Sequence, residues 1–307
     1  MTNNWKRPRP LQSGQKVTVL APAGRISPEA VTAGLAGLRE WGLEVETGEH
    51  LFALHHQFAG TDAQRLADLQ RALDDPAAAA IICARGGYGT TRIIDQLDFT
   101  AFLRQPKWVV GYSDITTLHL HLHRLGVESL HATMPLLFGR DTPPSVGSLR
   151  TLLFGGEIDY RVAPHGLNRP GEGSGVLVGG NLALLVSNVG TASDVDTRGK
   201  VLFLEDINEY LYSIDRMMVH LKRTGKLGGL AGLVVGHFSD SKDNDIPFGK
   251  DPHEIVADAV REYGYPVCYG FPVGHEPENW AMPCGRTVQL AVGPSGATLS
   301  SSPAVAT

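Results

Sequence analysis

The chain has 307 residues, 42% of them hydrophobic and 19% charged, so it carries enough apolar material for one large domain or two ordinary ones. Its 27 basic and 32 acidic side chains give a net charge of −5, which makes no electrostatic case for nucleic acid or an anionic membrane surface as a partner. The three cysteines lack C-x-x-C spacing, and neither a secretory signal nor an apolar window of about 18 residues is visible. We therefore expect a reduced, cytoplasmic protein without a structural zinc site.

The N-terminal half alternates strand and helix patterns along the chain. Short apolar, β-branched runs predict strands over residues 16–21, 43–47, 78–83 and 108–111. Apolar residues at helical spacing predict helices over residues 28–41, 61–73, 91–97 and 116–125. Strands separated by helices are typical of a mainly parallel sheet covered on both faces, in which ligands bind beyond the carboxyl ends of the strands.

Breaker residues cluster between residues 140 and 175, at Asp141-Thr-Pro-Pro and Pro170-Gly-Glu-Gly-Ser-Gly. We place a linker there, which joins an N-terminal domain over residues 1–155 to a C-terminal domain over residues 156–307. In the second domain the patterns predict strands over 175–178, 201–204, 232–235, 267–270 and 287–292, and helices over 182–187, 214–221 and 252–262. The last ten residues are small and polar, which predicts a frayed end.

The predicted fold class is therefore α/β. An N-terminal, mainly parallel sheet flanked by helices is followed by a C-terminal α/β domain.

A serine follows the predicted strand over residues 108–111, in the sequence Gly111-Tyr112-Ser113-Asp114. On a strand-to-helix turn such a serine is lifted out of the sheet, and the amides that follow it point to where an oxyanion would lie. The motif differs from the G-x-S-x-G of α/β-hydrolases, because Ile115 occupies its last position. From this pattern alone, a residue that merely caps the helix is the commoner explanation.

A glycine-rich turn, Arg85-Gly86-Gly87-Tyr88-Gly89, follows another predicted buried strand. Adjacent glycines let a main-chain amide approach a ligand closely, although a tight turn at the sheet edge explains them as well. The G-G-x-G spacing is not that of a dinucleotide-binding loop, and no Walker A motif occurs. We expect no cofactor.

Glu205-Asp206 and His275 also lie where predicted strands end, and His275 occupies a loop rich in glycine and proline. An imidazole titrates near neutral pH and makes a plausible general base, and a carboxylate that faces it would orient it. Taken one at a time, such residues are more often solvated surface groups.

Two further groups of residues raise the question of a metal site. His119, His121 and His123 alternate, so on a helix they do not share a face. His237 precedes an acidic turn over residues 240–245, but the spacing is not that of a calcium-binding EF-hand. We expect no metal.

Together, Ser113, Glu205 and His275 follow one another in an order that resembles one known family. From about residue 16 to residue 292 the chain resembles the LD-carboxypeptidases, serine peptidases that include murein tetrapeptide carboxypeptidase and the microcin-immunity peptidases. The residues that carry the likeness are Ala21-Pro22-Ala23, Ala59-Gly60-Thr61-Asp62 with Arg65, Ala84–Gly89, Pro106-Lys107, Gly111–Thr117, Gly179-Gly180-Asn181-Leu182, Leu204-Glu205-Asp206, Tyr212 with Ile214-Asp215-Arg216, and Gly274-His275 with Asn279, Pro283 and Gly285.

The resemblance implies a glutamine-amidotransferase-like N-terminal domain and a Ser–His–Glu triad. Ser113 would be the nucleophile, His275 its general base, and Glu205 the group that orients His275. The implied substrate is a murein tetrapeptide, whose L,D-peptide bond to the terminal D-Ala is cleaved. Members of the family commonly form homodimers.

The resemblance also implies an oxyanion hole, for which we assign the backbone amides of Asp114 and Gly87. A terminal carboxylate needs a cation or a nest of amides, and two arginines are candidates for it. The residues expected to bind substrate are Arg85, Gly86, Tyr112 and Arg216.

One motif departs from the family, since His131-Ala132-Thr133-Met134 stands where relatives often have His-Gly-Pro-Met. The replacement bears on one wall of the pocket rather than on the triad. The linker over residues 140–175 is short, whereas microcin-immunity relatives carry a longer insertion there, which favours a murein substrate. Two alternatives remain, a peptidase or amidase of peptidyl-nucleotide or acyl-amino-acid conjugates, and a non-catalytic protein that binds murein fragments.

Overall fold

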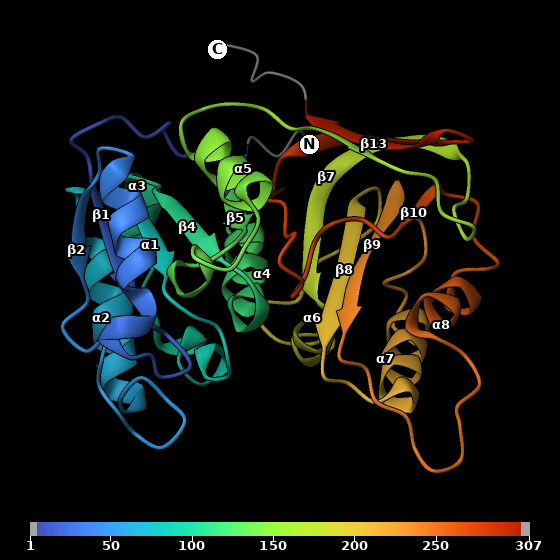
Figure 1. Cartoon of the computed structure of the whole chain (residues 1–307), viewed down its shortest axis with the longest axis horizontal. Helices are drawn as coiled ribbons and strands as arrows, with labels where there is room; N and C mark the ends of the chain where they lie inside the picture. Colours follow the sequence, from blue (N-terminus) through green and yellow to red (C-terminus); the bar gives the residue numbers. More distant parts are fainter. Residues whose placement is uncertain (1–4, 302–307) are drawn as a thin grey trace.

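Two β-sheets organise the chain in the computed structural model, which describes residues 5–301 (Figure 1). The first sheet has six strands in the order β11-β5-β4-β3-β1-β2. Five of them run parallel, and β11 pairs antiparallel with β5. Their bounds are β1 Lys16–Leu20, β2 Glu44–Thr47, β3 Ala78–Cys83, β4 Trp108–Gly111, β5 Ser129–His131 and β11 Met282–Cys284.

The second sheet has seven strands in the order β10-β9-β8-β7-β12-β13-β6. Strands β7 to β10 run parallel, whereas β12, β13 and β6 continue the sheet in antiparallel fashion. Their bounds are β6 Asp159–Val162, β7 Gly171–Asn181, β8 Val201–Ile207, β9 Gly232–Ser239, β10 Val267–Tyr269, β12 Thr287–Gly293 and β13 Gly296–Ser301.

Helices cover both sheets, and several begin at the capping residues that their sequences offer. Thr61 and Gln64 form a capping box at the start of α2, and Asp251 with Glu254 does the same for α8. The helices are α1 Pro28–Glu40, α2 Asp62–Asp74, α3 Thr100–Arg104, α4 Thr116–Arg124, α5 Pro143–Leu153, α6 Leu182–Ser187, α7 Leu211–Arg223 and α8 Pro252–Ala259, with short 3-10 turns at η1 Thr90–Arg92, η2 Ile94–Gln96, η3 Ser113–Ile115 and η4 Pro135–Leu137.

The predicted fold class, α/β with a mainly parallel N-terminal sheet, is confirmed. The helix expected over residues 91–97 is instead the two separate turns η1 and η2. The boundary between residues 155 and 156 stays a prediction. No helix in the described part of the chain is both long and apolar enough to cross a bilayer.

The glycine cluster after Pro170 is part of strand β7 and not a breaker. A side chain at Gly173 would come within 1.8 Å of the Ala231 carbonyl oxygen, and one at Gly175 within 2.4 Å of the Gly199 carbonyl oxygen. These glycines therefore allow other backbone segments to pass close to β7. Glycine within a strand often marks such a site of close approach. The sequence pattern alone does not distinguish this from a loop.

The chain crosses back to the first sheet after β10. Residues 270–281 leave the second sheet, β11 joins the first sheet, and β12 returns to the second. The loop that carries His275 therefore runs between the two sheets. The predicted fraying is wrong for residues 298–301, which pair in β13, while residues 302–307 lie outside the described part.

Candidate active site

Ser113 lies at the turn between β4 and α4, as the sequence predicted. Its φ of +64° is in the left-handed region, which is uncommon for a residue other than glycine. Such a conformation costs on the order of 1–3 kcal/mol, and it persists where the surrounding structure imposes it. No side chain caps η3 or α4, so the alternative in which Ser113 or Asp114 is merely a helix cap does not hold.

Glu205 and His275 meet although 70 residues separate them. The Glu205 carboxylate is fully buried on β8, and its Oε2 lies 2.7 Å from Nδ1 of His275. Gly274, at φ +135°, lets the loop approach, because a side chain there would lie 3.2 Å from Cβ of Glu205. With Nδ1 donating to the carboxylate, Nε2 of His275 remains available as a proton acceptor.

The charge of Glu205 determines how His275 titrates. Burial lowers the pKa of His275, but the charge of Glu205 and its hydrogen bond outweigh burial and hold that pKa above its ordinary value. The imidazole keeps about 12% of its side-chain surface exposed, so it remains accessible to a reacting group.

Tyr112, the residue before Ser113, packs its ring beside His275. Its ring lies 4.8 Å from the ring of His275 and 5.6 Å from that of His131. Tyr112 is only 4% exposed, which leaves little of it for a substrate, and its predicted binding role stays a prediction. Among residues 5–301 no hydrogen bond joins the Ser113 hydroxyl to His275, and such bonds often tighten only in the complex with substrate.

The glycine-rich turn after β3 lies against Ser113. A side chain at Gly86 would come within 2.9 Å of Cβ of Ser113 and 3.2 Å of its Oγ, so only glycine fits there without displacing the serine. Gly87 has φ +106° and approaches Gly24, whose N–H donates to the Gly86 carbonyl over 2.9 Å. In the described part of the chain the Gly87 N–H has no acceptor, which suits a donor to an oxyanion.

Two buried charged side chains hold this turn in place. The Asp114 carboxylate accepts a hydrogen bond from the Thr90 N–H over 2.8 Å, and burial raises the pKa of Asp114. The Arg65 guanidinium donates to the carbonyls of Pro22, over 2.7 Å, and Gly89, over 3.0 Å. Sequence reasoning missed these side-chain roles, because no local pattern pairs a helix residue with two distant loops.

A second network connects the helix after Ser113 to the second sheet. The N–H of Asn181, at the end of β7, donates to the Thr116 hydroxyl on α4 over 3.1 Å. Gly180 has φ +135°, and a side chain there would collide with that hydroxyl. Asp206 accepts from the Asn181 side chain over 2.7 Å, and burial together with the neighbouring carboxylate raises the pKa of Asp206 to about 7.

Neither candidate arginine makes a hydrogen bond or ion pair with a triad residue among residues 5–301. Arg85 donates to the carbonyl of Arg25 over 2.6 Å. Arg216 is exposed on α7, where its guanidinium lies 5.4 Å from the Tyr212 ring centre and 3.4 Å from the Ser213 hydroxyl. Their predicted binding of substrate stays a prediction.

The departure at residues 131–134 makes a new contact. The Thr133 hydroxyl donates to the Asp141 carboxylate, and burial raises the pKa of Asp141 to about 6. The Ala132 N–H donates to the Gly111 carbonyl over 3.1 Å, so the motif still packs behind the serine turn.

The alternating histidines of α4 belong to the core and its edge. His119 is buried between the Ser129 hydroxyl and the Gly111 carbonyl, each 2.8 Å from a ring nitrogen. Burial lowers its pKa to about 4, so the ring is neutral at physiological pH. Within residues 5–301 no group of three or more His, Cys, Asp or Glu side chains is arranged to hold a metal ion.

Comparison with known proteins finds relatives over nearly the whole chain. Residues 17–132 match the LD-carboxypeptidase N-terminal domain, and residues 174–290 match the LD-carboxypeptidase C-terminal domain. The chain is 38% identical to a Bacillus subtilis (strain 168) protein named "Probable murein peptide carboxypeptidase", over 94% of this chain and 92% of that one. It is 30% identical to the murein tetrapeptide carboxypeptidase of Pseudomonas aeruginosa, over 90% and 92% of the two chains.

Solved structures show the same fold. The muramoyltetrapeptide carboxypeptidase of Oxalobacter formigenes superposes with a TM-score of 0.85 at 28% identity, covering 94% of this chain and 98% of that one. A microcin C7 self-immunity protein superposes with a TM-score of 0.83 at 19% identity, over 96% and 98% of the two chains, a likeness that shows the fold alone. By both domain matches and the identity to these relatives, the chain belongs to the LD-carboxypeptidase family.

Proposed function

We propose that this protein is a serine carboxypeptidase that hydrolyses the L,D-peptide bond to the terminal D-Ala of murein tetrapeptides. The observation that carries the proposal is the 2.7 Å contact between the buried Glu205 and His275, which lies beside the strained serine turn. A carboxylate, an imidazole and a hydroxyl in this order are the groups that acyl transfer by a serine nucleophile requires. The relatives named as murein carboxypeptidases support the substrate class.

In the first step the Ser113 oxygen attacks the carbonyl carbon of the scissile bond, and its proton passes to Nε2 of His275. The negative charge that develops on the carbonyl oxygen is stabilised by the amides of Gly87 and Asp114. Glu205 stabilises the imidazolium through Nδ1. When the C–N bond breaks, the imidazolium gives its proton to the amine of the departing D-Ala, which leaves an acyl-enzyme.

In the second step water attacks the acyl carbon and gives a proton to His275. The Ser113 oxygen then leaves and regains that proton, so the shortened peptide is released and the enzyme is restored. Because His275 must be neutral to accept a proton, we expect kcat/KM to fall as the pH drops through the pKa of His275. That pKa is held above its ordinary value.

The test is the release of D-Ala from a purified murein tetrapeptide by the protein and by its Ser113→Ala variant. Removal of the nucleophile should lower kcat by at least about 10³-fold, with the fold retained by circular dichroism. Undiminished release by the variant would refute the mechanism. Assays of the protein and of the same variant on a peptidyl-nucleotide would test the alternative substrate class. We further propose a cytoplasmic homodimer, to be tested by cell fractionation and by light scattering at several concentrations.

A further inference from the structure

A pocket of about 460 Å³ lies beside the serine turn in the first sheet's half of the molecule. The loops after β1, β2 and β3 and the turn η4 build it, which places it at the carboxyl ends of these strands. Its volume lies within the range of about 300–1,000 Å³ typical of ligand sites. The residues that characterise its lining are Arg25, Ile26, Phe52, Leu54, Arg85 and Leu136.

The pocket adjoins the reacting serine. Arg85 lines it, and the next residue, Gly86, lies against Ser113. The N–H of Gly24 donates to the Gly86 carbonyl, so the loop that carries Arg25 is fixed to the same turn. A molecule whose scissile bond lies at Ser113 therefore has this pocket directly beside it.

Two arginines of the pocket have no carboxylate partner in the described part of the chain. The Arg25 guanidinium makes no hydrogen bond or ion pair with residues 5–301, and Arg85 donates only to the Arg25 carbonyl. Guanidinium groups bind carboxylates through paired, charge-assisted hydrogen bonds. The two side chains therefore leave positive charge available to a ligand.

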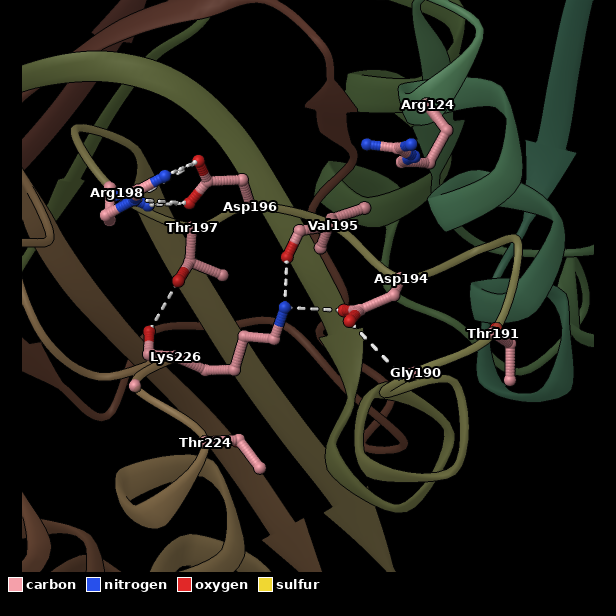
Figure 2. A pocket seen from close by; sticks show the side chains of 11 residues that line it. Arg124, Gly190, Thr191, Asp194, Val195, Asp196, Thr197, Arg198, Thr224 and Lys226 are labelled. Carbon is pink, nitrogen blue, oxygen red and sulfur yellow. Dashed lines mark hydrogen bonds and ion pairs between the residues drawn. The ribbon is translucent and has the colours of Figure 1, made fainter.

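A larger crevice elsewhere gives a useful contrast. It has a volume of about 670 Å³ and includes residues 194–198, just before the amino end of β8, whereas Glu205 lies near the other end of that strand. Figure 2 shows the side chains that line it. Two of its three basic side chains are paired, Lys226 with Asp194 and Arg198 with Asp196, whereas Arg124 has no ion pair among residues 5–301. In the pocket beside Ser113, by contrast, neither of the two arginines has an ion pair among residues 5–301, and no acidic side chain lines the pocket.

The walls of the smaller pocket are apolar. Phe52 is 38% exposed and Leu54 is 69% exposed, and they project from the loop after β2. Exposed side chains of this size are the ones that a ligand would cover. The ligand that fits is thus an anionic group attached to apolar atoms, and the pocket is far larger than a terminal alanine requires.

We propose that this pocket binds the part of the substrate on the acyl side of the scissile bond, with Arg25 and Arg85 on an internal carboxylate of the peptide. The proposal rests on the proposed function, in which the substrate is a murein tetrapeptide. In such a peptide the γ-linked D-glutamate has a free α-carboxylate close to apolar groups, whereas the carboxylate of D-Ala leaves with the product. Arg25, which no motif singled out, is then a specificity-determining residue.

The experiment measures binding of two tetrapeptides to the Ser113→Ala variant, which does not cleave them. One peptide has the free α-carboxylate on D-glutamate, and the other has a carboxamide there. We expect the carboxylate form to bind about tenfold or more tightly, since hydrogen bonds to charged groups have this effect. Adding Arg25→Gln should reduce the ratio of the two dissociation constants to near 1 and leave the carboxamide form almost unaffected.

Matched variants separate the pocket from general effects. Arg39→Gln removes the same charge from an exposed arginine of α1 outside the pocket and should preserve the ratio. Leu54→Ser should weaken both peptides several-fold, whereas Ile246→Ser, at an 86% exposed residue away from the pocket, should weaken neither. An unchanged ratio in Arg25→Gln, equal weakening of both peptides by it, or a loss of the ratio in Arg39→Gln would overturn the proposal.

Failure of this proposal and failure of the proposed function give different results. If the protein with Ser113 intact releases D-Ala from both peptides equally and their affinities are equal, the function stands and the pocket assignment falls. If the carboxylate form binds in the Arg25-dependent way but no D-Ala is released, the pocket assignment stands and the function falls. If neither peptide binds, the pocket assignment is refuted directly.

Discussion

Replacing Glu205 by glutamine removes the charge beside His275 while keeping the size of the side chain. The carboxylate is fully buried and lies 2.7 Å from Nδ1 of His275, so little solvent screens it. A hydrogen bond to a charged group contributes about 1.5–3 kcal/mol, which alone predicts a roughly 10- to 150-fold lower rate. The glutamine amide also favours the tautomer in which Nε2 carries the proton and does not accept one, which brings the expected loss in kcat/KM to about 10³–10⁴-fold.

The same substitution should shift the pH profile in a definite direction. Glu205 raises the pKa of His275, and burial opposes it. Without Glu205 only Asp206 and Glu276 oppose the effect of burial, so the pKa of His275 falls. Because activity requires the neutral imidazole, the acid limb of kcat/KM should move to lower pH in Glu205→Gln.

The assay is D-Ala release from murein tetrapeptide between about pH 5 and 9, compared with Glu276→Gln as the control. Glu276 lies next to His275 but bonds to the Ser239 hydroxyl, so its loss should shift the acid limb only slightly. An acid limb that stays in place or moves to higher pH in Glu205→Gln would refute this role of Glu205. A loss of kcat/KM in Glu276→Gln as large as that in Glu205→Gln would refute it as well.

Two further substitutions test the turn beside the serine and a buried arginine, Arg286, which pairs with Glu128 over 3.1 Å and with Glu157 over 3.0 Å. Gly86→Ala should lower kcat at least about tenfold and the free energy of unfolding by about 1–3 kcal/mol, because the new methyl group would lie 2.9 Å from Cβ of Ser113. Gly166→Ala, whose methyl group would meet no atom within 4 Å, should leave D-Ala release unchanged. Arg286→Met should lower the free energy of unfolding by about 3–5 kcal/mol, since the buried Glu128 then keeps only Arg7, 4.0 Å away, as an ion-pair partner. Arg161→Met, at a solvent-exposed pair, should change it by less than about 1 kcal/mol, and equal effects of the two in urea unfolding would contradict this account.

Local sequence rules determined much of the framework. Periodicity and β-branched runs located β1, β3 and β4, and the helical spacing of apolar residues located α1 and α2. These features depend on neighbours within a few residues, which is why a single sequence reveals them. The position of Ser113 on a strand-to-helix turn followed from the same local pattern.

The motifs and their order also predicted the family, which the domain matches confirm. They did not predict which glycines mark turns and which allow close packing. The sequence around Gly173 is typical of a strand or helix breaker. The need for glycine there follows from the Ala231 carbonyl oxygen, which lies close to this residue in the folded protein.

The site itself was decided by tertiary structure. Glu205 and His275 are both ordinary loop or strand-end residues in sequence, and the return of the chain to the first sheet through β11 brings them within 2.7 Å. Arg65 and Arg25 acquire their roles in the same way, from loops that are distant in sequence. Contacts between residues far apart along the chain depend on how whole sheets pack. Neighbouring residues set the conformation of each helix or strand, but which elements it contacts is decided only when the shared core forms.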